Sequence, residues 1–293
     1  MKEILRSIYH KMRALFHDIN PLNNSTLRVH WSYKDKNFGD VLNPILISKL
    51  SGQKVFPIRS INYSKKHYLV IGSILQYATR HSIVWGSGFI AADSHCIEKP
   101  SEVCAVRGPL SRKKLMDDGI ECPEIYGDPA LLLPAIYQPA IKKKYTLGII
   151  PHYVDKHHEW IKKNISSISD DILLIDVING NPLEVVDAIL SCEQIASSSL
   201  HGLIISDAYK IPSLWIEFSG NLLGGHFKFF DYFASVEKDI NGPYYIAIET
   251  TTDELKRSIP DYVDPKIDLQ KLIEACPFNL IERSKLFGKF SED

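Results

Sequence analysis

The feature that most constrains the fold is a regular alternation of short apolar runs with helical segments, which starts after Pro21. The first predicted strand covers residues 27–31, and the first helical segment covers residues 41–50. Runs that are apolar at nearly every position are typical of strands buried on both faces, with helices between them as the cover. The sequence therefore predicts an α/β fold with parallel sheets.

The alternation falls into two units separated by a proline-rich break. In the first unit we expect further strands at residues 68–72, 82–86, 103–107 and 124–126 and a helix at 109–117. In the second unit we expect strands at 145–150, 172–176, 194–197 and 213–216 and helices at 157–165, 182–191 and 202–209. Between the units, Pro129, Pro134 and Pro139 are followed by three lysines, a composition typical of a linker.

These breaks predict an N-terminal helix over residues 1–25, a first α/β domain over 26–141, a second over 142–240 and a C-terminal segment over 241–293. We expect a helix at 269–275 in the last segment to cross back to the first domain. Two α/β units that face one another place the carboxyl ends of both sheets along a shared cleft. Residues in the strand-to-helix turns are therefore the candidates for a functional site.

Composition narrows the class of protein. The chain of 293 residues carries 34 basic and 35 acidic side chains, so it offers no broad positive field for a nucleic acid. Its five cysteines are scattered and never in C-x-x-C spacing, which argues against a disulfide framework or a thiolate metal site. No apolar run is long enough to span a bilayer, and the start lacks the pattern of a signal peptide. We therefore expect a cytoplasmic protein.

The first segment has its own pattern. Apolar residues recur at helical spacing between positions 4 and 19, with Lys2, Arg6, Lys11 and Arg13 mostly between them. This pattern predicts a basic amphipathic helix. Two interpretations remain open: the helix packs on its own domain or a partner chain, or residues 1–20 hold the protein at the inner face of a membrane.

The first candidate turn covers residues 37–44. Gly39 permits a tight turn, and Asp40 either caps the helix that follows or stands at the mouth of the cleft. In the second role its carboxylate can accept a proton from an attacking hydroxyl group of a substrate. Asn37 and Gly39 are candidates for the cleft or for the site of that accepting substrate.

The second candidate turn delivers Arg107 from an apolar strand directly before a helix that opens with Pro109. A guanidinium there can make a two-pronged contact with a carboxylate or phosphate, and the helix N-terminus adds free N–H groups. The alternative is a structural ion pair between the two domains.

The third candidate turn is Ser199-Leu200-His201-Gly202, where a histidine stands ahead of an apolar helix. Gly202 allows close approach of the backbone, and the first-turn N–H groups of the helix suit an anion. Next to such an anion His201 can act as a proton donor. The alternative is a histidine with a structural role only.

Four further residues are weaker candidates for the cleft or the acceptor site. Asp128 follows the last strand of the first unit, where it can cap or brace the turn, and His152 follows the first strand of the second unit. Gly86 and Ser87 belong to a Trp-Gly-Ser-Gly turn that lacks the glycine spacing of a dinucleotide site.

Taken in order, the motifs Asn-Phe-Gly-Asp at 37–40, Trp-Gly-Ser-Gly at 85–88, Val-Arg-Gly-Pro at 106–109, Gly-Asp-Pro at 127–129 and Ser-Leu-His-Gly-Leu-Ile at 199–204 resemble the polysaccharide pyruvyl transferase family. The resemblance covers about residues 28–218. It implies two facing Rossmann-like domains in the manner of GT-B glycosyltransferases, with the donor on the second. Arg107 and His201 match the donor-binding arginine and histidine of the family, and Leu200 lends backbone contacts. Many members carry an arginine before that histidine, where this chain has Ser198 and Ser199.

The resemblance also implies the reaction. Phosphoenolpyruvate would be the donor, a lipid- or nucleotide-linked sugar of an exopolysaccharide or capsule precursor the acceptor, and a pyruvate ketal and phosphate the products. In this scheme His201 is the general acid and Asp40 the candidate base, while Arg107, Ser199, Leu200 and Gly202 surround the donor. No metal or organic cofactor is implied, since no ligand cluster has metal-binding spacing.

Two other functions fit the same architecture. A GT-B glycosyltransferase that uses a nucleotide sugar often carries a pair of glutamates seven residues apart, but Glu217 has no such partner. A non-catalytic glycan-binding protein would use aromatic residues such as Tyr244 and Tyr245 as stacking surfaces.

Overall fold

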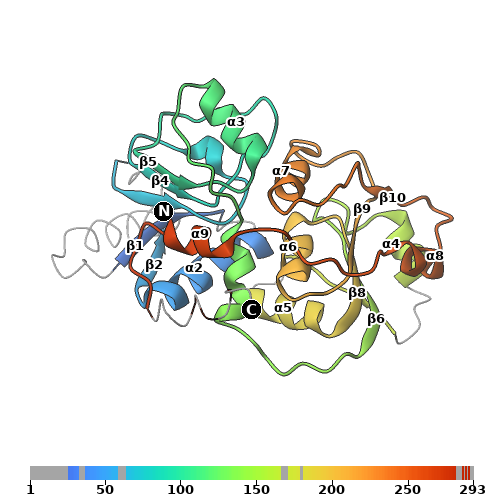
Figure 1. The fold of residues 1–293 in the computed structure, drawn as a ribbon. Helices are drawn as coiled ribbons and strands as arrows, with labels where there is room; N and C mark the ends of the chain where they lie inside the picture. Colours follow the sequence, from blue (N-terminus) through green and yellow to red (C-terminus); the bar gives the residue numbers. More distant parts are fainter. Residues whose placement is uncertain are drawn as a thin grey trace, which may run out of the picture.

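The computed structural model describes residues 26–32, 37–58, 64–165, 171–178 and 181–281, together with residues 286, 288 and 290. They form two five-stranded sheets (Figure 1). The first sheet has the order β2 (Lys54–Pro57), β1 (Thr26–His30), β3 (His67–Leu69), β4 (Ser82–Trp85), β5 (Glu102–Ala105). The second has the order β10 (Tyr244–Tyr245), β9 (Ser213–Glu217), β8 (Cys192–Ser197), β6 (Tyr145–Ile150), β7 (Ile172–Leu174). Every strand pair is parallel, which confirms the predicted α/β class and its two Rossmann-like units.

Both sheets share one strand order. When the strands of each unit are numbered from its own start, the order is 2-1-3-4-5 in both. In such sheets the chain turns to opposite faces after strands 1 and 3, and ligands bind beyond the carboxyl ends of these two strands. We therefore expect a ligand to contact the segments that follow β1 and β3 in the first unit and β6 and β8 in the second.

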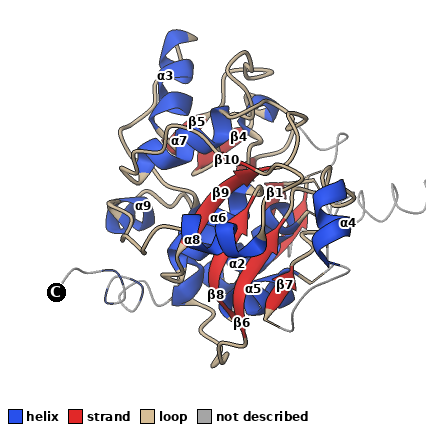
Figure 2. Cartoon of the chain, turned by 90° about the vertical axis from the view of Figure 1, so that its right-hand side faces the viewer, coloured by secondary structure: helices blue, strands red, loops and turns tan. Residues whose placement is uncertain are grey.

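Helices cover both sheets (Figure 2). The α-helices are α2 (Phe38–Ser51), α3 (Pro109–Asp117), α4 (Glu159–Ile165), α5 (Pro182–Leu190), α6 (Leu200–Ala208), α7 (Phe227–Ser235), α8 (Thr252–Ser258) and α9 (Leu269–Glu274), with 3-10 helices η3 (Leu75–Tyr77) and η4 (Pro129–Ala135). One apolar cluster runs from Val29 and Leu42 in the first unit to Ile195 and Trp215 in the second. The two units therefore share a continuous core, and helix α7 packs on α3 across their boundary.

Two helices begin earlier than the sequence predicts. Helix α2 starts at Phe38 rather than at residue 41, and α6 starts at Leu200 rather than at residue 202. The expected strand at 124–126 is reduced to a single bridge between Val106 and Tyr126. The short edge strands β2 and β10 were not predicted, because β2 contains Pro57 and β10 has only two residues.

The proline-rich break is not a simple linker. Pro129–Ala135 forms η4, whose residues 129–133 are buried and which packs against α6 of the second unit. The exposed crossing follows, over residues 138–144. The chain returns at α9, where the Trp85 indole N–H donates to the Leu272 carbonyl at 2.8 Å and Phe278 packs edge-on against Trp85.

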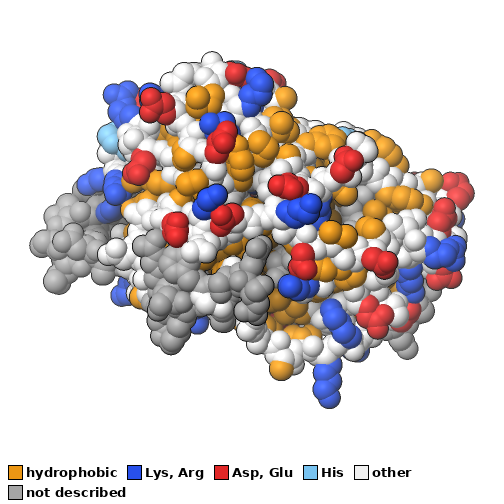
Figure 3. All heavy atoms as spheres, in the orientation of Figure 1, with side chains coloured by type: hydrophobic (Ala, Val, Ile, Leu, Met, Phe, Trp, Pro, Cys, Tyr) orange, Lys and Arg blue, Asp and Glu red, His pale blue; other side chains and the backbone are white. Residues whose placement is uncertain are grey.

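The predicted N-terminal amphipathic helix over residues 1–25 lies outside the described residues. Among the residues that are described, no helix is both long and apolar enough to cross a bilayer. The face drawn in Figure 3 intersperses acidic and basic side chains without a field of one sign.

Candidate active site

A cavity of about 240 Å³ opens where the two sheets face each other. Most of its lining follows the four strands that the topology singles out. The segment after β1 contributes Ser32, Asn37 and Asp40, that after β3 Gly72 and Ser73, that after β6 His152 and Tyr153, and that after β8 Ser199, Leu200 and His201. The ligand-binding ends of both sheets therefore meet in one cavity.

The N-terminus of α2 forms one wall of the cavity. Asn37 is the N-cap, because its Oδ1 accepts a hydrogen bond from the Gly39 amide at 3.2 Å. Of the two roles considered for Asp40, the capping role is therefore taken by Asn37. Asp40 stands in the first turn instead, where its Oδ1 lies 3.4 Å from the Ser32 amide and its carboxylate borders the cavity.

His201 reaches the cavity from the second unit, in the first turn of α6. Its imidazole rests on the α-carbon of Gly39, since a Cβ built on that glycine would lie 2.0 Å from Nδ1. A side chain at position 39 is therefore incompatible with this ring position. The Nδ1 edge faces the same turn of α2 that carries Asn37 and Asp40.

The other edge of the imidazole faces Asp128. Nε2 lies 3.5 Å from Asp128 Oδ2, too far for a hydrogen bond of normal length. Both atoms are buried and have no hydrogen-bond partner within the described residues. The second carboxylate oxygen, Oδ1, caps η4 by accepting from the Ala130 amide at 2.9 Å. Asp128 thus stands behind His201, fixed to a buried helix of the first unit.

Arg107 forms an ion pair between the two units, with Asp231 as its partner. Its side chain is fully buried, Nε and Nη2 bond Asp231 Oδ2 of α7 at 3.0 and 2.9 Å, and Nη2 also donates to the Phe89 carbonyl at 2.7 Å. Gly88 lies against the guanidinium. The group itself does not line the cavity, but Nη1 donates to Ser73 Oγ at 2.7 Å and Ser73 does. Arg107 therefore borders the site through Ser73.

The remaining glycines and serines divide into lining and support. Ser199 and Leu200 line the cavity at the start of α6. Gly202 is outside the lining and allows α6 to pack on Ser197, whose Oγ would lie 2.3 Å from an added Cβ. Gly86, with φ of +88°, packs against Pro129, and Ser87 donates to the Gly72 carbonyl at 2.9 Å. These last three residues support the walls from behind.

His152 lines the cavity as a neutral group. Burial, followed by the positive charge of Lys228, lowers the pKa of His152 to about 4. Its backbone amide donates to Ser198 Oγ at 2.7 Å, which ties the segment after β6 to that after β8.

The cavity is also lined by a lysine, Lys228, which was not predicted from the sequence. This lysine lies in the first turn of α7 and is only 8% exposed. Burial, and then the charge of Arg107, lower the pKa of Lys228 to about 8. The available signal was its place in Phe227-Lys228-Phe229-Phe230, where a single charge stands among aromatic residues. Tyr77, Ile90 and Leu223 of the lining were missed as well, since nothing in their local sequence marks them.

Within the part of the chain that the structure describes, no cluster of three or more histidines, cysteines or carboxylates is arranged to hold a metal ion. All five cysteines are free. Burial raises the pKa of Cys104 and of Cys122 to about 12, so neither offers a thiolate nucleophile.

Comparisons with known proteins give one family match and two relatives. A family model described as polysaccharide pyruvyl transferase matches residues 1–220. Uncharacterized protein L143 of Acanthamoeba polyphaga mimivirus is 31% identical over 259 residues, which are 84% of this chain and 86% of that protein. Succinoglycan biosynthesis protein ExoV of Rhizobium meliloti (strain 1021) is 29% identical over 213 residues, which are 69% of this chain and 62% of ExoV. No solved structure gives a significant match.

Proposed function

We propose that this chain, which belongs to the polysaccharide pyruvyl transferase family, moves an enolpyruvyl unit from phosphoenolpyruvate onto a sugar of an exopolysaccharide or capsule precursor. The relative ExoV is named for succinoglycan biosynthesis, which supports a role in polysaccharide assembly. The acceptor would be a lipid- or nucleotide-linked sugar, met in the cytoplasm or at the inner face of the membrane. The product is a pyruvate ketal.

One observation carries the proposal: the cavity brings His201 of one unit against the turn of the other unit that holds Asp40. An imidazole and a carboxylate on facing walls can serve as general acid and general base around one substrate. Lys228 lines the same cavity, so an anionic donor finds a cation beside the acid.

The reaction then proceeds in two stages. His201 donates a proton to the methylene carbon of the donor, and the adjacent carbon becomes an oxocarbenium-like centre. A sugar hydroxyl attacks that centre, gives its proton to Asp40 and forms the first C–O bond. The C–O bond to phosphate then breaks, and a second sugar hydroxyl attacks the same carbon and gives its proton to the departing phosphate. This closes the ketal and releases hydrogen phosphate. The scheme needs no metal or organic cofactor.

Arg107 enters the scheme through Ser73. As the guanidinium is held by Asp231, it positions the Ser73 hydroxyl at the cavity wall. Ser199 and Leu200 present the start of α6 to the donor, His152 lines the cavity near them, and Asn37 borders the space left for the acceptor.

The position of Glu217 argues against the glycosyltransferase alternative, in which such a glutamate grips the ribose of the nucleotide. Glu217 is occupied by a 2.5 Å contact with His226 Nε2 and is not part of the lining. The described lining therefore offers no glutamate for a nucleotide sugar.

The test is incubation with phosphoenolpyruvate and a lipid- or nucleotide-linked sugar. Phosphate release together with a gain of about 70 daltons on the acceptor supports the proposal. Release of a nucleotide would indicate glycosyl transfer, and binding without either product would indicate a glycan-binding protein. His201→Ala should abolish turnover at saturating donor, and full turnover by this variant would remove His201 as the acid.

A further inference from the structure

We propose that Lys228, together with the N-terminus of α6 and His152, forms the seat for the phosphate group of the donor. The inference rests on the proposed function for the identity of the donor, but its evidence is the local geometry. Lys228 also lies beyond residues 1–220, which the family model matches.

The first observation is that Lys228 lacks a counter-ion. It is 8% exposed and lines the cavity, yet no carboxylate, carbonyl or hydroxyl accepts a hydrogen bond from its Nζ anywhere in the described ranges. Its Nζ lies 5.4 Å from the centroid of the Phe229 ring, a favourable but weak contact. The nearest carboxylate of α7, Asp231, is engaged by Arg107 and Ser111. A buried ammonium without a paired anion is unfavourable unless a ligand supplies that anion.

The second observation is that the surroundings of Lys228 are positive. It lies in the first turn of α7, where the helix dipole disfavours a cation. The charge of Arg107 also opposes its protonation. Three unfavourable features therefore meet at one lysine, and a bound anion would offset all three.

The third observation is the start of α6, which lines the same cavity. Ser199 is the N-cap but makes no side-chain capping bond. The amides of the first turn have no partner within the helix, so they are available to an anion. His152, neutral at physiological pH, completes the wall and can donate a hydrogen bond without adding charge.

These features select a phosphate rather than a carboxylate. A phosphate offers several strong acceptor oxygens, enough for an ammonium, backbone amides and an imidazole N–H together. The motif before His201 supplies only Ser198 and Ser199, so within the described lining the cation comes from α7 instead.

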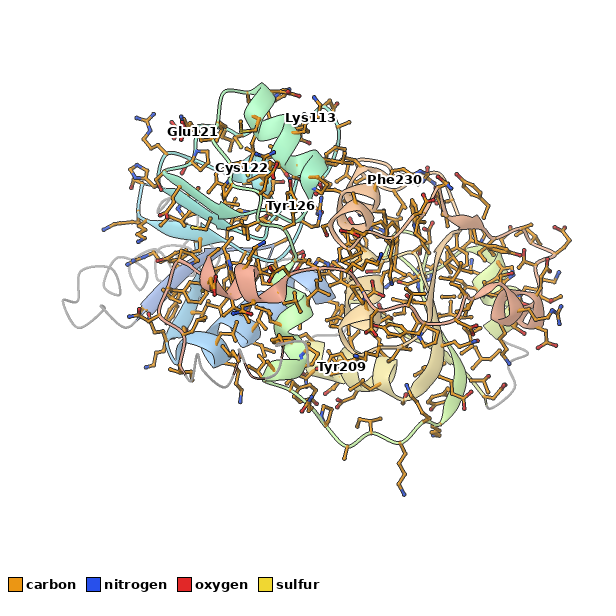
Figure 4. All side chains as sticks on the ribbon, viewed as in Figure 1. Lys113, Glu121, Cys122, Tyr126, Tyr209 and Phe230 are labelled. Atoms are coloured by element: carbon orange, nitrogen blue, oxygen red, sulfur yellow. The ribbon has the colours of Figure 1, made fainter. Side chains whose placement is uncertain are left out.

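The experiment measures binding of phosphoenolpyruvate and, separately, of inorganic phosphate by calorimetry in a phosphate-free buffer. The variants are Lys228→Met, which removes the charge, and Lys228→Arg, which keeps it. Lys113→Met is the matched control, because Lys113 lies on α3 (Figure 4), its side chain is 72% exposed and it pairs with Asp117.

We expect Lys228→Met to lower the affinity for both ligands by roughly 30-fold or more. Lys228→Arg should retain most of the affinity, and Lys113→Met should bind both ligands as the original protein does. The melting temperature of Lys228→Met should not fall, which separates lost binding from lost structure.

The outcomes distinguish this inference from the proposed function. If Lys228→Met binds both ligands as the original protein does, the phosphate seat is overturned, while the proposal that phosphoenolpyruvate is the donor still stands. The original protein could instead bind inorganic phosphate but not phosphoenolpyruvate, and Lys228→Met could lose the binding of phosphate. This result would support the phosphate seat and overturn phosphoenolpyruvate as the donor. If the original protein binds neither ligand, both proposals fail.

Discussion

At the scale of single residues, the site depends on two buried charged side chains, Asp128 and Lys228, that lack a close ionic partner. Asp128 Oδ2 faces His201 Nε2 at 3.5 Å, and Lys228 faces the open cavity. Apo sites often show long catalytic hydrogen bonds that shorten when substrate binds. We therefore regard Asp128 as a positioning residue for His201.

Asp128→Asn tests this role. An amide keeps the Oδ1 acceptor that caps η4 but removes the charge behind the imidazole. We expect kcat to fall by about tenfold or more, with little change in KM and a shifted pH profile. The control is Asp268→Asn, since Asp268 caps α9 in the same way, at 2.9 Å from the Lys271 amide. Equal kcat values for the two variants would leave Asp128 with a capping role only.

Lys228 predicts a dependence of stability on pH. Its folded pKa of about 8 is below its ordinary value of 10.5, with burial as the main cause and Arg107 as the second; His152 also faces it. The unfolded chain therefore holds more protons between pH 8 and 10.5, and the stability contributed by this group rises across that window. Below pH 8 the lysine is charged in both states, so the full free-energy cost of burying its charge is present. Lys228→Met should raise the free energy of unfolding at pH 7 by on the order of 1–3 kcal/mol, and less at pH 10.

The measurement is urea unfolding of both proteins at pH 7 and pH 10, without anionic ligands. A destabilised Lys228→Met at pH 7 would contradict the claim that the lysine is an unpaired buried cation.

At the scale of elements, the sequence predicts most of the strands and helices but misses the detail that makes the site. The apolar runs locate β4 and β6, because burial on both faces leaves a clear signal. The starts of α2 and α6 are missed by two or three residues, since the pattern of apolar residues begins after the capped first turn. Those first turns carry Asp40 and His201. Contacts such as Gly39 against His201 join segments far apart in the chain, so no local pattern reveals them.

Gly39→Ala tests this contact between α2 and α6. The added methyl group would overlap the imidazole, with 2.0 Å between Cβ and Nδ1. We expect turnover to fall by roughly 100-fold, because the His201 imidazole is displaced from the position that the proposed mechanism requires. Alanine is a better helix former than glycine, so stability should fall by less than in an ordinary overpacked core. Gly242→Ala, where a Cβ meets nothing within 4 Å, is the control. Unaltered turnover by Gly39→Ala would show that the ring position is not required.

At the scale of the whole molecule, the two units are joined by a buried polar cluster of Arg107, Ser111 and Asp231, called the lock below. Asp231 of α7 accepts hydrogen bonds from Arg107 and from the Ser111 amide and hydroxyl, at 2.8 and 2.7 Å, on α3. Gly108 allows this approach, because a Cβ there would lie 1.8 Å from the Asp231 carbonyl oxygen. Sequence analysis identified Arg107 but not Asp231, since the two lie 124 positions apart.

Asp231→Asn should lower the free energy of unfolding by about 3–5 kcal/mol, because it leaves a buried guanidinium without its counter-charge. Urea denaturation measures the loss. Asp117→Asn provides the comparison, as it breaks the exposed pair with Lys113 and should cost at most about 1 kcal/mol. A similarly small effect of Asp231→Asn would mean that the lock contributes little to the union of the two units.

The continuous core and the lock have a consequence for how a ligand enters. Two units fused in this way resist separation, so the walls of the cavity are preorganised and forms with and without ligand should superpose closely. A ligand must enter through the existing opening, and Tyr77, Tyr153 and Leu223 are the large exposed side chains of the lining. A rigid receptor of this kind loses little binding energy to rearrangement, which leaves more of it for stabilising the transition state.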